Sequence, residues 1–222
     1  MTPRTTERHL IDGPAGPLEV VLNIPEGPRG IALIAHPHPL QGGTLDNKVA
    51  QTLARTFFGL GYASIRFNFR GAGGSAGSFE DGVGETEDAL AALSWTQQRL
   101  AGNAPSAAGT LPVVLAGFSF GSFVQTRVAQ RIAAERMVLV APAVNRFTVE
   151  SVPADTIVIH GEEDDVVPLS AVFEWARPME LPVVVFPGCG HFFHRRLVQL
   201  QQVIAGMWRT RVTESHTPSP ND

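Results

Sequence analysis

A serine between two glycines is the strongest chemical signal in this chain. Residues 117–121 read Gly-Phe-Ser-Phe-Gly and fit the pattern G-x-S-x-G around Ser119. A chain with 22 glycines can match this pattern by chance, but here a strand-like run precedes it and a helical pattern follows. Such a tight turn holds the serine in a strained backbone conformation and raises its oxygen above the sheet. The serine then lies at a helix N-terminus, whose dipole favours a developing negative charge. The context therefore predicts Ser119 as a nucleophile.

A serine hydroxyl is a weak nucleophile until a base takes its proton, and the base needs an acid to orient it. Two later segments offer these groups. Residues 160–168 read His-Gly-Glu-Glu-Asp-Asp-Val-Val-Pro, and residues 188–193 read Gly-Cys-Gly-His-Phe-Phe. Each follows an apolar run, and catalytic groups gather at strand ends in open α/β sheets. The pattern predicts His191 as the base and either Asp164 or Asp165 as the acid.

Other reactive side chains have simpler interpretations. His194 stands where the last predicted helix begins and is a weaker candidate for the base. Cys189 precedes the histidine in a glycine-rich turn, and we interpret it as incidental because a serine already fills the role of nucleophile. Arg70 follows another strand end and could face the cleft, but arginines more often pair with carboxylates. Its expected partner is Glu80, Asp81 or Glu85.

A tetrahedral acyl intermediate needs two or more hydrogen-bond donors for its oxyanion. One should be the backbone N–H of Phe120, the residue after the nucleophile. The other is expected from residues 36–43, which read His-Pro-His-Pro-Leu-Gln-Gly-Gly. The two prolines have no N–H and stiffen the loop. Beyond the strand end, His38 and Leu40 are therefore the candidate donors. We also expect Leu40, together with Phe192 beside the base, as a possible lining of the substrate pocket.

Two cofactor chemistries are disfavoured. A metal site at His36 and His38 would need a third ligand, usually with a carboxylate, and no H-E-x-x-H or comparable cluster appears. Residues 71–84 are rich in glycine but lack both the G-K-[ST] ending of a phosphate loop and a G-x-G-x-x-G that leads into a helix. The sequence therefore predicts no metal and no cofactor.

These segments together resemble the α/β-hydrolase superfamily over nearly the whole chain. The superfamily pattern His-Gly-x-x-Asp-x-x-Val-Pro matches residues 160–168, which implies Asp164 as the acid, although a one-residue change in the loop would exchange it for Asp165. The pattern Gly-x-x-His implies His191 as the base. The expected chain order of serine, acid and histidine is met.

The closer resemblance is to small bacterial hydrolases similar to dienelactone hydrolases. Their His-Pro-His-Pro segment followed by Gly-Gly matches residues 36–43. A second shared block lies at residues 67–75, which read Phe-Asn-Phe-Arg-Gly-Ala-Gly-Gly-Ser. By the superfamily pattern, His38 is the favoured second oxyanion donor.

The elements that must position these residues are short apolar strands alternating with helices. Most of the runs are apolar on both faces, which is typical of strands buried in a parallel sheet, and helices then cover both sides. The predicted strands are 18–24, 30–36, 62–68, 113–117, 137–141, 156–160 and 183–186. An antiparallel edge is expected from 18–24 and a strand near 8–11, joined by a loop at 13–17. The predicted helices are 46–60, 84–101, 120–134, 169–176 and 195–209.

The segment between the predicted strands 137–141 and 156–160 limits which substrates the site can enclose. Many α/β-hydrolases insert a cap before the acid-bearing strand, but here only about a dozen residues are available, which is enough for a loop or one short helix. The expected fold is therefore an α/β-hydrolase fold with a mostly parallel, twisted sheet and no cap domain. An open site favours short, soluble esters. The expected activity is that of a carboxylesterase; a thioesterase, lactonase or peptidase on the same triad, or a non-catalytic binding protein, are the alternatives.

Length and composition set the remaining expectations. The 222 residues suit a single domain over 1–210, with a flexible tail at 211–222 and a surface loop at 103–110. The formal net charge of −4 argues against nucleic acid and anionic membranes as partners. One cysteine and no apolar leader favour the cytoplasm, and no apolar stretch is long enough to span a bilayer. We expect a small-molecule ester as the partner, bound by a monomer or a homodimer.

Overall fold

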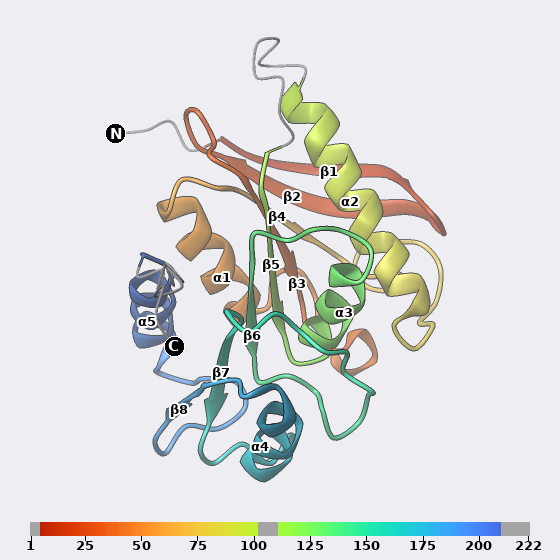
Figure 1. The fold of residues 1–222 in the computed structure, drawn as a ribbon. Coiled ribbons are helices and arrows are strands. Elements are labelled where there is room, and N and C mark those ends of the chain that lie inside the picture. The colour runs from red at the N-terminus through yellow and green to blue at the C-terminus, as the bar shows by residue number, and fades with distance from the viewer. Residues whose placement is uncertain (1–4, 102–110, 210–222) are drawn as a thin grey trace, which may run out of the picture.

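The computed structural model describes residues 5–101 and 111–209, which form one eight-stranded sheet with helices on both faces (Figure 1). The strand order is β1-β2-β4-β3-β5-β6-β7-β8. The hairpin strands β1 (Thr5–Gly13) and β2 (Gly16–Ile24) are antiparallel, and β2 also pairs antiparallel with β4 (Ala63–Phe67). All later pairs are parallel. The remaining strands are β3 (Ile31–Ala35), β5 (Val113–Phe118), β6 (Arg136–Val140), β7 (Ile157–Gly161) and β8 (Val183–Phe186).

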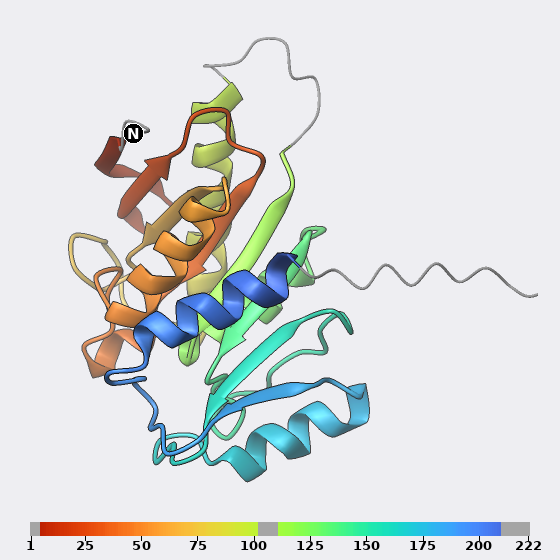
Figure 2. The same cartoon turned by 90° about the vertical axis from the view of Figure 1, so that its left-hand side faces the viewer.

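This arrangement confirms the predicted α/β fold. The central strands β3, β4, β5 and β7 bury every residue, which explains why their sequences are apolar on both faces. Two large apolar clusters, one on each face, form the core. Helices α1 (Lys48–Gly59) and α5 (Leu197–Arg209) cover one face and lie against each other, as Figure 2 shows. Helices α2 (Val83–Ala101) and α3 (Phe120–Ala129) cover the other.

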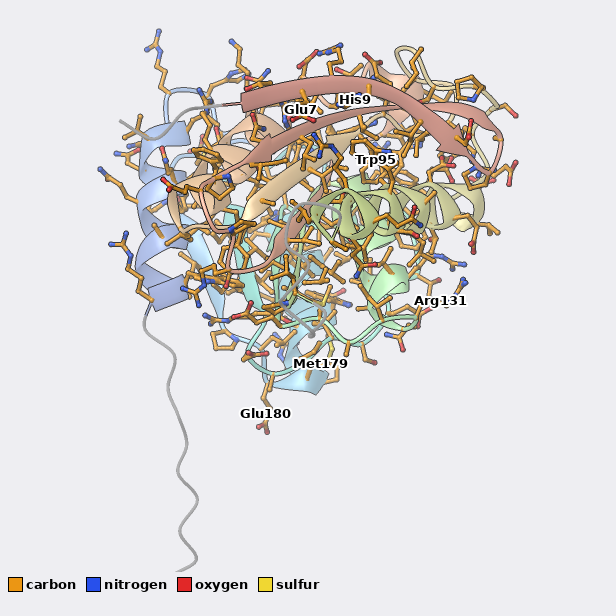
Figure 3. All side chains as sticks on the ribbon, turned by 90° about the horizontal axis from the view of Figure 1, so that it is seen from above. Glu7, His9, Trp95, Arg131, Met179 and Glu180 are labelled. Carbon is orange, nitrogen blue, oxygen red and sulfur yellow. The ribbon has the colours of Figure 1, made fainter. Side chains whose placement is uncertain are left out.

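The hairpin edge is tied to α2. A two-residue turn at 14–15 joins β1 to β2, as the loop prediction required. Figure 3 shows β1 above α2, with His9 and Trp95 facing each other across the gap. Their rings lie 5.1 Å apart, and Arg99 of α2 pairs with Glu7 of β1. At the opposite edge of the sheet, α4 (Leu169–Ala176) packs on β7 with a third, smaller apolar cluster.

Three helices differ from the prediction by two residues or more at an end. Helix α1 begins at Lys48 rather than at 46, because the side chain of Asn47 caps it. Helix α3 stops at Ala129, five residues before the predicted end at 134, because the chain turns there to reach β6. Helix α5 begins at Leu197 rather than at 195. Phe193 and Arg195 have φ values of 52° and 62°, which a right-handed helix excludes, so the helix starts only beyond them. The apolar periodicity continues into the turn after α3 and the turn before α5, so the predicted helices were too long at these ends.

No cap domain is inserted before the acid-bearing loop. Residues 141–156 link β6 to β7 and contain neither a helix nor a strand, as predicted from the short spacing. Among the residues that the structure describes, no helix is both long enough and apolar enough to cross a bilayer. The predicted surface loop at 103–110 and the tail at 211–222 lie outside the described residues, so the proposed domain limits remain a prediction.

Candidate active site

Ser119 occupies a strained turn between β5 and α3. Its φ and ψ are 55° and −118°, a conformation that few residues with a side chain adopt. The turn is held by the N–H of Ser119, which donates to the carbonyl of Val140 at 2.9 Å. A Cβ on Gly117 would lie 2.5 Å from the backbone of Gly121, and one on Gly121 would lie 2.3 Å from the Ala35 carbonyl. The close approach of these backbones explains both glycines of the motif.

His191 connects the serine to a carboxylate. Its Nε2 lies 3.0 Å from Oγ of Ser119, and its Nδ1 lies 2.7 Å from Oδ2 of Asp164. An ionised carboxylate only accepts, so Nδ1 carries the proton and Nε2 is free to accept the serine proton. The three residues follow β5, β7 and β8, whose carboxyl ends lie along one edge of the sheet. Residues 72 positions apart in the chain therefore meet within hydrogen-bond distance.

The carboxylate that reaches His191 is that of Asp164, and Asp165 is exposed. Oδ1 of Asp164 accepts the N–H groups of Val166 and Val167 at 2.9 and 2.8 Å. Burial alone would raise the pKa of this carboxyl group, but the hydrogen bonds from His191 and Val167 outweigh it and hold the pKa below its usual value. Asp164 is therefore a buried, ionised acceptor, as the orienting acid of such a site must be.

The two backbone amides predicted to bind an oxyanion are those of Phe120 and His38. Phe120 is the first residue of α3, so its N–H has no partner within the helix. Within residues 5–101 and 111–209, neither this amide nor that of His38 donates to another group. The N–H of Leu40 is engaged differently, because it donates to Nδ1 of His38 at 3.3 Å. Of the two donors left open by the sequence, His38 is thus the one with an available amide.

His36 ties this loop to its neighbour and does not point into the site. Its fully buried ring lies 2.6 Å from the Pro37 carbonyl through Nδ1, and its Nε2 accepts the N–H of Phe69 at 3.0 Å. Burial lowers the pKa of His36 to about 3, so the ring is neutral. Over the described parts of the chain, no group of three His, Cys, Asp or Glu side chains could hold a metal ion. The hydrogen bond between His36 and Phe69 was not predicted, because it depends on β3 and β4 being neighbours in the sheet.

A second buried network holds the loop after β4. Asn68 accepts the N–H of Leu45 at 2.7 Å and donates to Oε2 of Glu19 at 2.6 Å. The same Glu19 oxygen accepts the N–H of Gly74 at 2.7 Å. A Cβ on Gly73 would lie 2.0 Å from Nδ2 of Asn68, so this position excludes a side chain. The glycines of this block therefore make room for hydrogen bonds within the loop.

Arg70 pairs with carboxylates, but the main partner is one that the prediction omitted. It binds Asp88 through Nε at 3.1 Å and Nη2 at 2.8 Å, and also Glu80 at 2.8 Å. Of the three predicted alternatives, Glu80 is confirmed as a partner, whereas Glu85 accepts the N–H groups of Glu80 and Gly82. Asp81 is exposed and forms no ion pair with Arg70. Asp88 lies on the inner face of α2, and knowing which face was buried would have identified it.

The two residues predicted to line the substrate pocket are exposed, whereas the ring of Phe120 is buried. Leu40 and Phe192 are 72% and 48% exposed, whereas the side chain of Phe120 is 1% exposed and packs between Phe69 and Phe123. The ring of Phe120 therefore belongs to the core, and only its amide faces the site. His194 is exposed and contacts Phe192. Two cavities of about 510 and 400 Å³ lie elsewhere, and no residue of the Ser119 site lines either of them.

Known proteins resemble this chain in sequence and in fold. The family model for the X-Pro dipeptidyl-peptidases (S15 family) matches residues 12–150. An uncharacterized protein of Rickettsia prowazekii, RP471, is 32% identical over 219 residues, which cover 87% of this chain and 84% of that protein.

Two solved structures are also similar over most of the chain. An alpha-beta serine hydrolase homologue from Coxiella burnetii has a TM-score of 0.81 and 37% identity, covering 90% of this chain and 96% of its own. XC6422 from Xanthomonas campestris, described as an α/β serine hydrolase without a lid, has a TM-score of 0.82 and 34% identity, with 93% and 95% covered.

Proposed function

This chain belongs to the X-Pro dipeptidyl-peptidase (S15) family and has the lidless α/β serine hydrolase fold, and from that premise we propose that it is a carboxylesterase acting on short, soluble esters. The observation that carries the proposal is the hydrogen-bonded line from Ser119 through His191 to Asp164, with distances of 3.0 and 2.7 Å. In this arrangement Asp164 can orient the ring of His191, and His191 can take the serine proton, as nucleophilic catalysis requires.

The proposed reaction is acyl transfer through a covalent intermediate. Oγ of Ser119 attacks the ester carbonyl carbon while Nε2 of His191 takes the hydroxyl proton, and the carbonyl electron pair moves onto oxygen. The amides of Phe120 and His38 bind that oxyanion. When the intermediate collapses, the C–O bond to the alcohol breaks and His191 returns its proton to the departing oxygen. Water then repeats the sequence on the acyl-enzyme and releases the acid.

The preference for short esters follows from the short connection at residues 141–156. Without a cap, little apolar surface can enclose a long acyl chain, so extending the chain adds little binding energy. Leu40 and Phe192 are the exposed apolar side chains that would contact a short acyl or alcohol group. A small ester also meets no steric barrier at such a site.

A second candidate is a peptidase that removes X-Pro dipeptides, because the matching family model carries that description. The match ends at residue 150. It therefore includes Ser119 and the loop of His38 but neither Asp164 nor His191. Since one fold and one triad serve many substrates, the match supports the serine chemistry more strongly than the peptide substrate.

Labelling with a fluorophosphonate probe tests the serine mechanism. The wild-type protein and a control variant at an exposed serine, Ser94→Ala, should label equally, whereas Ser119→Ala should not label. An unlabelled wild type, or equal labelling of Ser119→Ala, would contradict the proposal.

A substrate panel then tests the specificity. With p-nitrophenyl esters, kcat/KM should be highest for the shortest acyl chains, and thioesters, lactones and X-Pro anilides should react more slowly. A rise in kcat/KM beyond roughly eight acyl carbons would exclude the short-ester proposal. Faster hydrolysis of X-Pro anilides than of any ester would favour the peptidase.

A further inference from the structure

The mechanism above uses only one of the two histidines that contact Asp164. The other is His160, in the last part of β7, whose side chain is fully buried. Its Nε2 lies 2.8 Å from the carbonyl oxygen of Val167 and 3.4 Å from Oδ2 of Asp164. Its Nδ1 is buried and has no hydrogen-bond partner. This buried imidazole needs an explanation, because burying a polar ring costs free energy unless both of its nitrogens are hydrogen-bonded.

The acceptors around His160 determine where its proton lies. A carbonyl oxygen and an ionised carboxylate both accept hydrogen bonds and donate none, so Nε2 must carry the proton. A second proton on Nδ1 would be buried without an acceptor, which disfavours the charged ring. His160 is therefore a neutral imidazole with one N–H, directed at Val167 and, less closely, at Asp164.

The contacts of Asp164 form a closed set. Oδ1 accepts the amides of Val166 and Val167, while Oδ2 accepts Nδ1–H of His191 and faces Nε2–H of His160. Val167 is thus held at both its N–H and its carbonyl, by Asp164 and His160 respectively. Without His160, the loop from β7 to Val167 would lose its hydrogen bond to the strand. Oδ2 of Asp164 would then be contacted by the side chain of His191 but no longer by that of His160.

We propose that His160 is a positioning residue for the acid: its Nε2–H donates to the Val167 carbonyl and so fixes the loop whose amides hold Asp164, and Nε2 lies 3.4 Å from Oδ2, which keeps the carboxylate aligned with Nδ1 of His191. This inference rests on the proposed function, in which His191 is the base. His160 moves no proton and touches no substrate in this role.

Charge explains why a neutral ring suits this position. The ionisable groups that influence His160 are Asp164 and His191, and Cys189 lies near the same carboxylate. During catalysis His191 becomes a cation, and a second cation at His160 would compete for the same carboxylate. Burial lowers the pKa of His160 and raises that of the Cys189 thiol, so both stay neutral and neither adds a charge beside Asp164.

Two substitutions separate positioning from packing. His160→Leu removes the N–H but keeps an apolar side chain, and kcat should fall about 10- to 100-fold with KM little changed, as expected when the loop that holds the Asp164 carboxylate loses its hydrogen bond to β7. His160→Gln restores an N–H donor and should recover most of that loss. His9→Leu, a histidine on β1, is the matched control and should keep wild-type kcat. Rates are normalised to fluorophosphonate-labelled sites, so that unfolded protein does not count.

Nitrogen-15 NMR of histidine-labelled protein gives a readout that does not depend on any substrate. His160 should appear as the neutral Nε2–H form near neutral pH, and the Nδ1 signal of His191 should shift in His160→Leu and return in His160→Gln. A charged or Nδ1-protonated His160, an unshifted His191 signal, or a kcat for His160→Leu within about twofold of wild type would each overturn the inference. If wild-type labelling fails, the proposed function falls, while the NMR arm still tests how Asp164 is held.

Discussion

On one side of Ser119, the loops after β7 and β8 bring Asp164, His160 and His191 into one cluster; we call this the acid–base side. On the other, the loops after β3 and β4 are joined by His36 and Asn68, and we call this the oxyanion side. Both sides are buried and both are rich in hydrogen bonds. On the acid–base side, backbone amides hold side chains that do the proposed chemistry. On the oxyanion side, the roles are reversed: side chains hold the backbone, and backbone amides bind the oxyanion in the proposed reaction.

This difference decides how substitutions should act. A change on the acid–base side removes a group that carries or orients a proton, so activity should fall without a matching loss of stability. A change on the oxyanion side removes a hydrogen bond between two loops. The loss of activity should then depend on how far the amide of His38 is displaced. Buried ion pairs behind that side, such as Arg70 with Asp88, should affect stability first.

The largest effect is expected for the acid. Asp164→Asn should lower kcat for a short ester by roughly 10⁴-fold, since an amide there favours the wrong histidine tautomer, as known for a serine-protease triad. Asp165→Asn, at the exposed neighbour, should leave kcat within about twofold of wild type. Steady-state kinetics with thermal unfolding as a folding check would measure this. Equal losses in the two variants would remove the distinction between these carboxylates.

The next largest effect concerns stability behind the oxyanion side. Arg70→Met leaves Asp88 buried and unpaired, so the free energy of unfolding should drop by about 3–5 kcal/mol. The control is Arg131→Met, because Arg131 (labelled in Figure 3) forms an exposed pair with Glu87, worth about 0–1 kcal/mol. Urea unfolding compares the two. Similar losses in both variants would show that burial of the Arg70 pair is unimportant.

A smaller effect is expected where a side chain acts through the backbone. His36→Phe removes the acceptor for Phe69 N–H and the link to Pro37, so the oxyanion loop shifts and kcat should fall roughly 10- to 100-fold, less than for a donor lost outright. His38→Asn keeps the backbone amide and should lose less activity. If His38→Asn were the worse variant, the His38 side chain would have a role of its own.

The smallest effect, over the range just below neutral pH, is a dependence of stability on pH. The pKa of His36 is about 3 when folded and 6.5 ordinarily, so below pH 6.5 the unfolded chain binds a proton that the folded protein does not. The stability present above pH 6.5 is therefore lost as pH falls towards 3, by up to about 1.4 kcal/mol per unit. His160, whose pKa burial also lowers, acts in the same direction.

Urea unfolding at several pH values between 7.5 and 5 measures this slope. His36→Phe should have a shallower slope than wild type, whereas a variant at the exposed His194, His194→Phe, should retain the wild-type slope. An unchanged slope in His36→Phe would mean that the ring takes up its proton in the folded state.

Local patterns were enough to predict the strands, the helices and the sharp turn at Ser119. Each depends on residues close in sequence, such as the glycines at 117 and 121, whose need for space follows from the turn itself. The helix ends at 129 and 197 were missed because positive φ values and chain reversal leave no mark in apolar periodicity. The contact between Arg70 and Asp88 was missed because it depends on which face of α2 is buried.

By itself, the sequence determined the fold class, the order of the candidate catalytic residues along the chain and the absence of room for a cap before β7. Only the tertiary structure decided which carboxylate faces His191, which amide of the loop at 36–43 is available, and that His36 and His160 are neutral ties. The physical reason is that a side chain's partner depends on strand order. Parallel strands bring together the ends of segments far apart in the chain, and these meetings set burial, hydrogen bonding and charge.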